Sequence, residues 1–73
     1  MEKSLLEQLM ALPADATTAT VQGVAMQVID ETTRQSLLQS DPEDTHIHEC
    51  TLSNGTFIAD MQNGWLIALY KVR

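Results

Sequence analysis

The residues best suited to chemistry are His46, His48 and Cys50, which alternate with other residues along the chain. On a β-strand, side chains at every second position point to the same side, so these three would line one face of a sheet. Imidazole nitrogens and thiolate sulfurs are the ligands that zinc prefers in proteins. The spacing therefore marks the best candidate for a metal site, and carboxylates just before it in the chain could add an oxygen ligand.

The same three residues also fit an ordinary strand, and we favour that interpretation. A small thiol such as that of Cys50 is common in an apolar interior, and His46 at the start of a strand can simply be solvated. A nucleophile pair of Cys50 with His48 would hold the two residues about 7 Å apart, with no third residue to orient them. The chain also lacks the glycine-rich, GxSxG and HExxH motifs of common enzyme classes. We therefore predict a non-enzymatic protein without a metal or another cofactor.

These residues belong to the last third of the chain, which contains two Asn-Gly pairs, Asn54-Gly55 and Asn63-Gly64. Asn-Gly favours the two positive φ angles of a type I′ turn, which joins adjacent antiparallel strands. The runs that flank each pair are rich in apolar and β-branched residues, as strands are. The pattern predicts a three-stranded meander over residues 46–53, 56–62 and 65–72.

Two-residue turns would place Leu52 opposite Phe57 and Met61 opposite Leu66. One face of the meander would then have small residues at its centre, and the other face would be bulkier. The bulkier face would carry Ile47, Glu49, Thr51, Ile58, Asp60, Gln62, Trp65, Ile67, Leu69 and Lys71. A β-bulge in any strand would reshuffle this arrangement.

The large apolar residues of the bulkier face would be costly to leave in water. Their exposure would lose roughly 7–15 kcal/mol of burial free energy, which is comparable to the whole free energy of unfolding of a small domain. Two short helices cannot easily cover both faces of the sheet. We therefore expect a partner on this face, and the expected partner-binding residues are Ile58, Trp65, Ile67 and Leu69.

Two carboxylates, Glu49 and Asp60, would lie directly opposite each other on the bulkier face. Like charges in that position destabilise a sheet, so the pair could instead be a functional carboxylate pair. We favour a solvated edge of the face, or neutralisation by a basic residue of a partner.

The first half of the chain predicts two helices. Ser4 and Glu7 match a capping box, apolar residues then recur at helical spacing, and Pro13 ends the helix, which predicts residues 5–12. Asp30 is a suitable N-cap for a second helix over residues 31–39. The loop that follows carries three carboxylates, Asp41, Glu43 and Asp44.

Residues 19–29 fit two structures. Val24, Met26 and Val28 alternate as in a strand, whereas Val21, Val24 and Val28 also recur at helical spacing. The share of β-branched residues favours a strand. The helix alternative would continue through residue 39 and leave a three-stranded sheet.

The chain has ten acidic residues against four basic ones and a formal charge of −6. Nucleic acids and anionic membrane surfaces are bound through Lys and Arg, so we expect neither as a partner. No apolar run approaches the roughly 20 residues of a membrane-spanning helix. The single cysteine excludes an internal disulfide and fits a reducing compartment, so we expect a cytoplasmic protein.

Together these patterns predict one small α+β domain over residues 1–73, with a small antiparallel sheet of three or four strands and two short helices in the order α-β-α-β-β-β. We expect a protein-interaction module that self-associates as a homodimer, through an apolar sheet face or the N-terminal helix, or that binds another protein. One alternative is a small acidic inhibitor of anti-restriction, anti-CRISPR or immunity type that blocks a basic groove of a nucleic-acid-handling protein. Its carboxylates would be Asp30, Glu31, Asp41, Glu43, Asp44 and Glu49. A second alternative is a small-molecule or metal-binding domain around residues 46–50.

Overall fold

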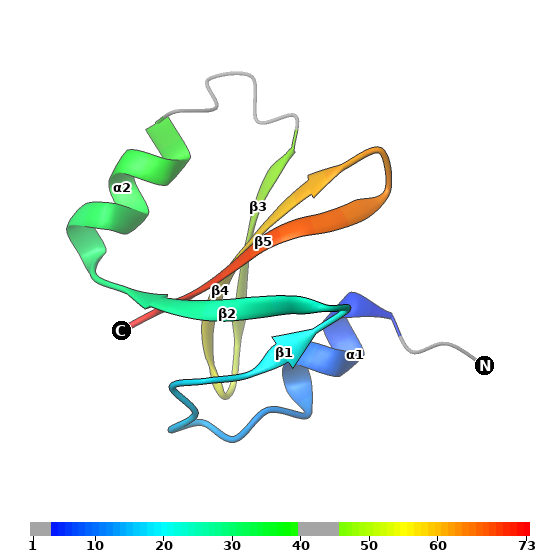
Figure 1. Ribbon diagram of the computed structural model, residues 1–73. Helices are drawn as coiled ribbons and strands as arrows, with labels where there is room; N and C mark the ends of the chain where they lie inside the picture. Colours follow the sequence, from blue (N-terminus) through cyan, green and yellow to red (C-terminus); the bar gives the residue numbers. More distant parts are fainter. Residues whose placement is uncertain (1–3, 40–45) are drawn as a thin grey trace.

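The computed structural model describes residues 4–39 and 46–73, which form a five-stranded mixed sheet and two helices (Figure 1). In chain order the elements are α1 (Leu5–Met10), β1 (Thr20–Val21), β2 (Val24–Ile29), α2 (Glu31–Gln39), β3 (Ile47–Leu52), β4 (Gly55–Gln62) and β5 (Trp65–Val72). The small α+β fold with two helices is therefore confirmed. The predicted order lacked one strand, and the sheet is not wholly antiparallel, because β2 and β5 pair in parallel.

The ambiguous segment at residues 19–29 is a hairpin rather than one strand or a helix. Its turn lies at Gln22 and Gly23, whose φ angles are 51° and 79°. Two successive positive φ angles are the signature of a type I′ turn, which suits the twist of paired strands. The hairpin joins the short strand β1 to β2, with Val21 opposite Val24.

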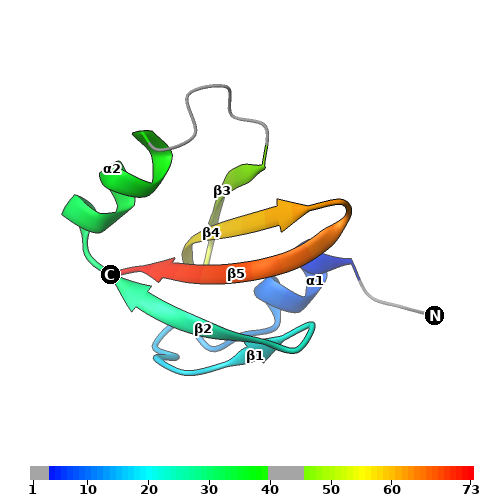
Figure 2. The same ribbon diagram turned by 45° about the horizontal axis from the view of Figure 1, so that its top comes forward.

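Strand β5 lies at the centre of the sheet, whose order is β1-β2-β5-β4-β3. Since β4 is antiparallel to both β5 and β3, strands β2, β3 and β5 all run in the same direction. The connection from β2 to β3 must then cross over one face of the sheet, and α2 lies in that connection. Figures 1 and 2 show α2 at the end of the sheet where β2 finishes, with α1 lying apart from it near β1.

The two helices cover opposite faces of the sheet. Consecutive residues of β4 illustrate this, because Phe57 belongs to the core beside α1 and Ile58 to the core beside α2. The core beside α1 contains the buried residues Leu9, Val21, Met26, Phe57, Ala59, Leu66 and Leu69. The smaller core consists of Ile29, Ile47 and Ile58, with Leu37, Leu38, Tyr70 and Val72 packed against it.

Both helices begin at the N-caps that the sequence predicts. The Ser4 hydroxyl oxygen accepts from the backbone N–H of Glu7 at 3.2 Å, and an Asp30 carboxylate oxygen accepts from that of Thr33 at 2.8 Å. Helix α2 spans the predicted residues, whereas α1 ends at Met10 rather than at residue 12.

The register of the meander differs from the prediction at two points. In the first hairpin Leu52 pairs with Gly55, so the turn residues are Ser53 and Asn54 rather than the Asn-Gly pair. The second turn is as predicted, with φ angles of 53° at Asn63 and 80° at Gly64.

A bulge follows the second turn and shifts the pairing between β4 and β5. Met61 still pairs with Leu66, but Asp60 pairs with Ala68, which leaves Ile67 as the extra residue. From there on, the residues of β5 point to the opposite face from the one that the sequence analysis assigned. Ala59 therefore lies opposite Leu69, and both belong to the core beside α1.

Candidate functional site

The predicted partner-binding residues fall into three groups. Ile58 and Leu69 are 0% and 1% exposed, so both are core residues and neither can contact a partner in this fold. Helix α2 covers Ile58, and the bulge turns Leu69 toward α1. Trp65 and Ile67 remain exposed, at 73% and 47%. Asp41, Glu43 and Asp44, the loop carboxylates that would contact a basic partner, lie outside the described residues.

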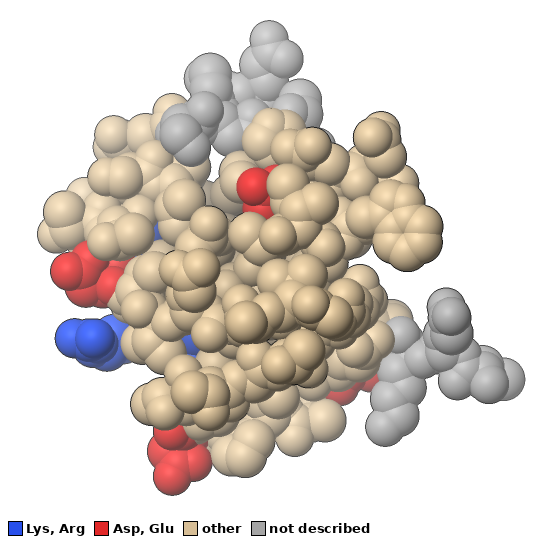
Figure 3. All heavy atoms as spheres, in the orientation of Figure 1, with Lys and Arg blue, Asp and Glu red and all other residues tan. Residues whose placement is uncertain are grey.

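Trp65 and Ile67 belong to the half of a sheet face that α2 leaves open. Across the strands, Trp65 pairs with Gln62, and Gln27 pairs with Tyr70 on the same face. We call the exposed part of this surface the open half-face, and it consists of Ala25, Gln27, Gln62, Trp65 and Ile67. In the view of Figure 3 the charged side chains lie mainly toward the margins, while the middle of the molecule, over β2 and β5, is uncharged.

The carboxylates near this face are engaged by neighbouring residues. Oδ1 of Asp60 lies 3.2 Å from Nδ1 of His46. Glu49 lies opposite Ile58 rather than opposite Asp60, so the predicted carboxylate pair does not form. Glu49 instead accepts a hydrogen bond from Nε of Arg34, and this bond is the main reason why the pKa of the Arg34 guanidinium is raised.

The candidate metal ligands do not converge. His46 precedes β3 and contacts Asp60, His48 is exposed, and Cys50 is a half-buried free thiol. Within residues 4–39 and 46–73, no three His, Cys, Asp or Glu side chains gather as a group that could hold a metal ion.

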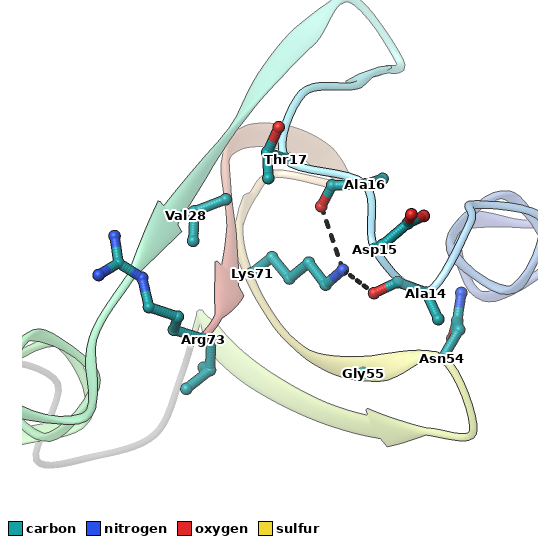
Figure 4. Close-up of a pocket in the computed structure, with 10 residues that line it drawn as sticks. Ala14, Asp15, Ala16, Thr17, Val28, Asn54, Gly55, Lys71 and Arg73 are labelled. Carbon is teal, nitrogen blue, oxygen red and sulfur yellow. Dashed lines mark hydrogen bonds between the residues drawn. The ribbon is translucent and has the colours of Figure 1, made fainter.

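The structure contains a pocket that the sequence analysis did not find. Its volume is about 310 Å³, and its lining residues are Ala14, Asp15, Ala16, Thr17, Val28, Asn54, Gly55, Lys71, Val72 and Arg73. Figure 4 shows Lys71 crossing it from β5 toward the loop of residues 14–16. The ammonium nitrogen of Lys71 donates to the carbonyl oxygens of Ala14 and Ala16, at 2.5 and 3.1 Å.

Lys71 is only 8% exposed, and its inward position follows from the bulge in β5. Without the bulge, Lys71 would lie on the other face, where the sequence analysis placed it. Asn54 closes another side of the pocket. Its side-chain nitrogen donates to the carbonyl oxygens of Leu9, in α1, and Leu12, just beyond it, both at 2.8 Å. The Leu9 carbonyl also accepts from the backbone N–H of Leu12.

Comparison of the chain with protein-family models, with curated proteins and with solved structures finds no match. Among the described residues, no helix is both long and apolar enough to cross a membrane.

Proposed function

We propose that the chain is a non-enzymatic protein-interaction module that self-associates, and that a second copy docks on the open half-face. The observation that carries this proposal is the 73% exposure of Trp65 beside the exposed Ile67. Tryptophan is among the residues that dominate binding energy at protein interfaces, and it is seldom left in water without a reason.

The charge distribution supports the choice of this surface. Two copies that each carry a formal charge of −6 repel one another at long range. The five residues of the open half-face include no charged residue, so close contact there brings few like charges together. Nearby Asp60 is paired with His46, and this pair can lie at the rim of the interface.

Among the residues that the structure describes, helix α1 offers a second exposed apolar surface, with Leu6 at 47% and Met10 at 58% exposure. We favour the open half-face because Trp65 presents a larger apolar area and loses less side-chain entropy on docking than methionine does. The hairpin between β4 and β5 also holds Trp65 in a fixed register with Gln62. Helix α1 therefore supplies a control surface for the experiment.

The test is the mass of the protein in solution as a function of concentration, measured by light scattering. A mass that rises toward twice 8.1 kDa supports the proposal. Trp65 is the chain's single tryptophan, so its fluorescence reports directly on the proposed surface. A monomeric mass up to millimolar concentration, with unchanged Trp65 emission, contradicts it.

The acidic-inhibitor alternative draws less support from the structure. Of the carboxylates assigned to it, Asp30 caps α2, and Glu31 and Glu49 both pair with Arg34. These groups already have partners within the chain. Ionic strength separates the two proposals, because salt weakens binding to a basic groove steeply and weakens an apolar interface little.

A further inference from the structure

The chain contains two Asn-Gly pairs, and the fold holds them in different ways. Asparagine is among the chemically labile residues of proteins, because the backbone nitrogen of the next residue can attack its side-chain amide. A glycine in that next position has no Cβ to obstruct the attack. The two pairs are alike in sequence, so a difference in their reactivity comes from their surroundings in the fold.

The fold restrains the reacting amide of Asn54. Its side-chain nitrogen, which would have to leave, donates to the carbonyl oxygens of Leu9 and Leu12, both at 2.8 Å. Its side-chain oxygen is buried. The amide can therefore turn toward the backbone nitrogen of Gly55 only after both hydrogen bonds are broken.

The backbone nitrogen of Gly55, which would make the attack, is also engaged. The backbone N–H of Met61 donates to the carbonyl oxygen of His46 at 2.8 Å, which marks these two residues as a hydrogen-bonded pair. Such pairs alternate with non-hydrogen-bonded pairs along an antiparallel ladder. Counted along the register of β3 and β4, Leu52 and Gly55 form another hydrogen-bonded pair. The Gly55 N–H therefore belongs to the ladder and is not available for attack.

The second pair, Asn63-Gly64, has none of these restraints. Both residues are exposed, and they form the two-residue turn between Gln62 and Trp65. Among the residues that the structure describes, neither the Asn63 side chain nor the Gly64 N–H has a hydrogen-bond partner. Apart from its chain neighbours, no atom lies within 4 Å of the position that a Cβ of Gly64 would occupy. Figures 1 and 2 show this turn at the free tip of its hairpin.

We propose that Asn63 is a site of spontaneous covalent modification, and that the fold protects Asn54 from the same reaction. The Gly64 nitrogen loses its proton to water and forms a bond to Cγ of Asn63. The bond from Cγ to Nδ2 breaks, and Nδ2 leaves as ammonia with a proton taken back from water. A second water molecule then opens the succinimide ring. Opening at Cγ gives aspartate, and opening at the main-chain carbonyl carbon gives isoaspartate.

The modification weakens docking at the open half-face, a consequence that rests on the proposed function. Either product places a carboxylate between Gln62 and Trp65, which belong to a surface without charged residues. In a symmetric dimer the new charge is present twice, so like charges meet at the interface. Isoaspartate also adds a methylene carbon to the main chain of the turn that holds Trp65 opposite Gln62. Self-association therefore declines as the protein ages.

The test is peptide mapping by mass spectrometry during incubation at mildly alkaline pH, at a concentration where the chain is monomeric. A parallel incubation in urea is the reference. In the folded chain Asn63 should convert more than about tenfold faster than Asn54, because attack at Asn54 first requires the loss of several hydrogen bonds. In urea the two sites should convert at comparable rates. Equal rates at the two sites of the folded chain, or a ratio that urea leaves unchanged, overturn the proposal.

The variants Asn63→Asp and Ser53→Asp measure the effect on self-association. Each adds one carboxylate to a turn, but Ser53 lies in the turn between β3 and β4, at the other end of β4. Asn63→Asp should raise the dissociation constant of the dimer about threefold or more beyond the effect of Ser53→Asp, because its charge lies beside the interface. Equal effects overturn the consequence for docking. A chain that stays monomeric overturns that consequence together with the docking proposal, whereas the peptide maps still decide the modification site.

Discussion

Replacement of Trp65 by serine is the sharpest test of the docking surface. The side chain is 73% exposed in the isolated chain, so little of its packing within the domain is lost. An aromatic side chain of this size has roughly 200 Å² of surface, of which about 150 Å² is then still available for burial. At about 25 cal/mol per Å², complete burial would contribute about 3.7 kcal/mol in each copy.

A symmetric dimer contains the same residue twice, so the substitution acts on both copies. If docking covers about half of each tryptophan, the loss is about 3 to 4 kcal/mol in the dimer. Each 1.4 kcal/mol corresponds to a factor of about ten, so the dissociation constant should rise by more than a hundredfold. The free energy of unfolding of the monomer should change little, because the substituted side chain is largely solvated.

The assay is sedimentation or light scattering over a wide concentration range, combined with urea unfolding at a concentration where the protein is monomeric. Met10→Ser is the matched control, because Met10 is 58% exposed on α1 and lies outside the open half-face. Disruption of self-association by Met10→Ser but not by Trp65→Ser would contradict the proposed docking surface. A dissociation constant of the Trp65→Ser variant within about threefold of the original value would contradict it as well.

Three further predictions concern stability and are measured by urea unfolding. Asn54→Ala should lower the free energy of unfolding by about 1–2 kcal/mol, because the Leu12 carbonyl loses its side-chain donor and the Leu9 carbonyl keeps only the N–H of Leu12; Ser53→Ala in the same turn is the control and should have no comparable effect. Gly55→Ala should cost about 1–2 kcal/mol, because φ is +142° and a Cβ would lie 3.1 Å from the Lys71 side chain; an unchanged midpoint would contradict this. Asp30→Asn should flatten the pH dependence of stability below about pH 4. The bond from Thr33 lowers the pKa of Asp30 from 3.8, so its stabilisation is present above that value and is lost as the pH falls through the folded-state pKa; parallel pH profiles for the two proteins would contradict this cause.

Local signals in the sequence were sufficient for the helices and for most strand positions. Helix α2 begins at a carboxylate cap, and the second turn has the Asn-Gly pair that a type I′ turn needs. The first turn is one residue from its predicted place, and its Asn54 side chain donates to the carbonyls of Leu9 and Leu12, a contact that a pattern confined to the hairpin cannot reveal. The turn at Gln22 and Gly23 was missed because glutamine is an uncommon residue at positive φ.

The candidate sites depend on features that no short stretch of sequence encodes. The bulge at Ile67 arises because Leu66 and Leu69 both reach the core beside α1, although strict alternation would place them on opposite faces. The same shift carries Lys71 inward, where it lines the pocket. Helix α2 can cover Ile58 because the connection from β2 to β3 crosses over that face of the sheet. This crossover can be inferred only when the parallel pairing of β2 with β5 is known.

The central position of β5 also constrains how the protein can fold during synthesis. Strand β2 pairs only with β5 and with the two residues of β1, so it cannot join the sheet until residues 65–72 have been made. Until then, the apolar sides of the helices and of the hairpin between β3 and β4 stay partly exposed to solvent, because contacts distant in sequence form slowly. During that interval the apolar strands of the nascent chain are accessible to chaperones and to other chains. Completion of the domain is therefore governed by its last strand.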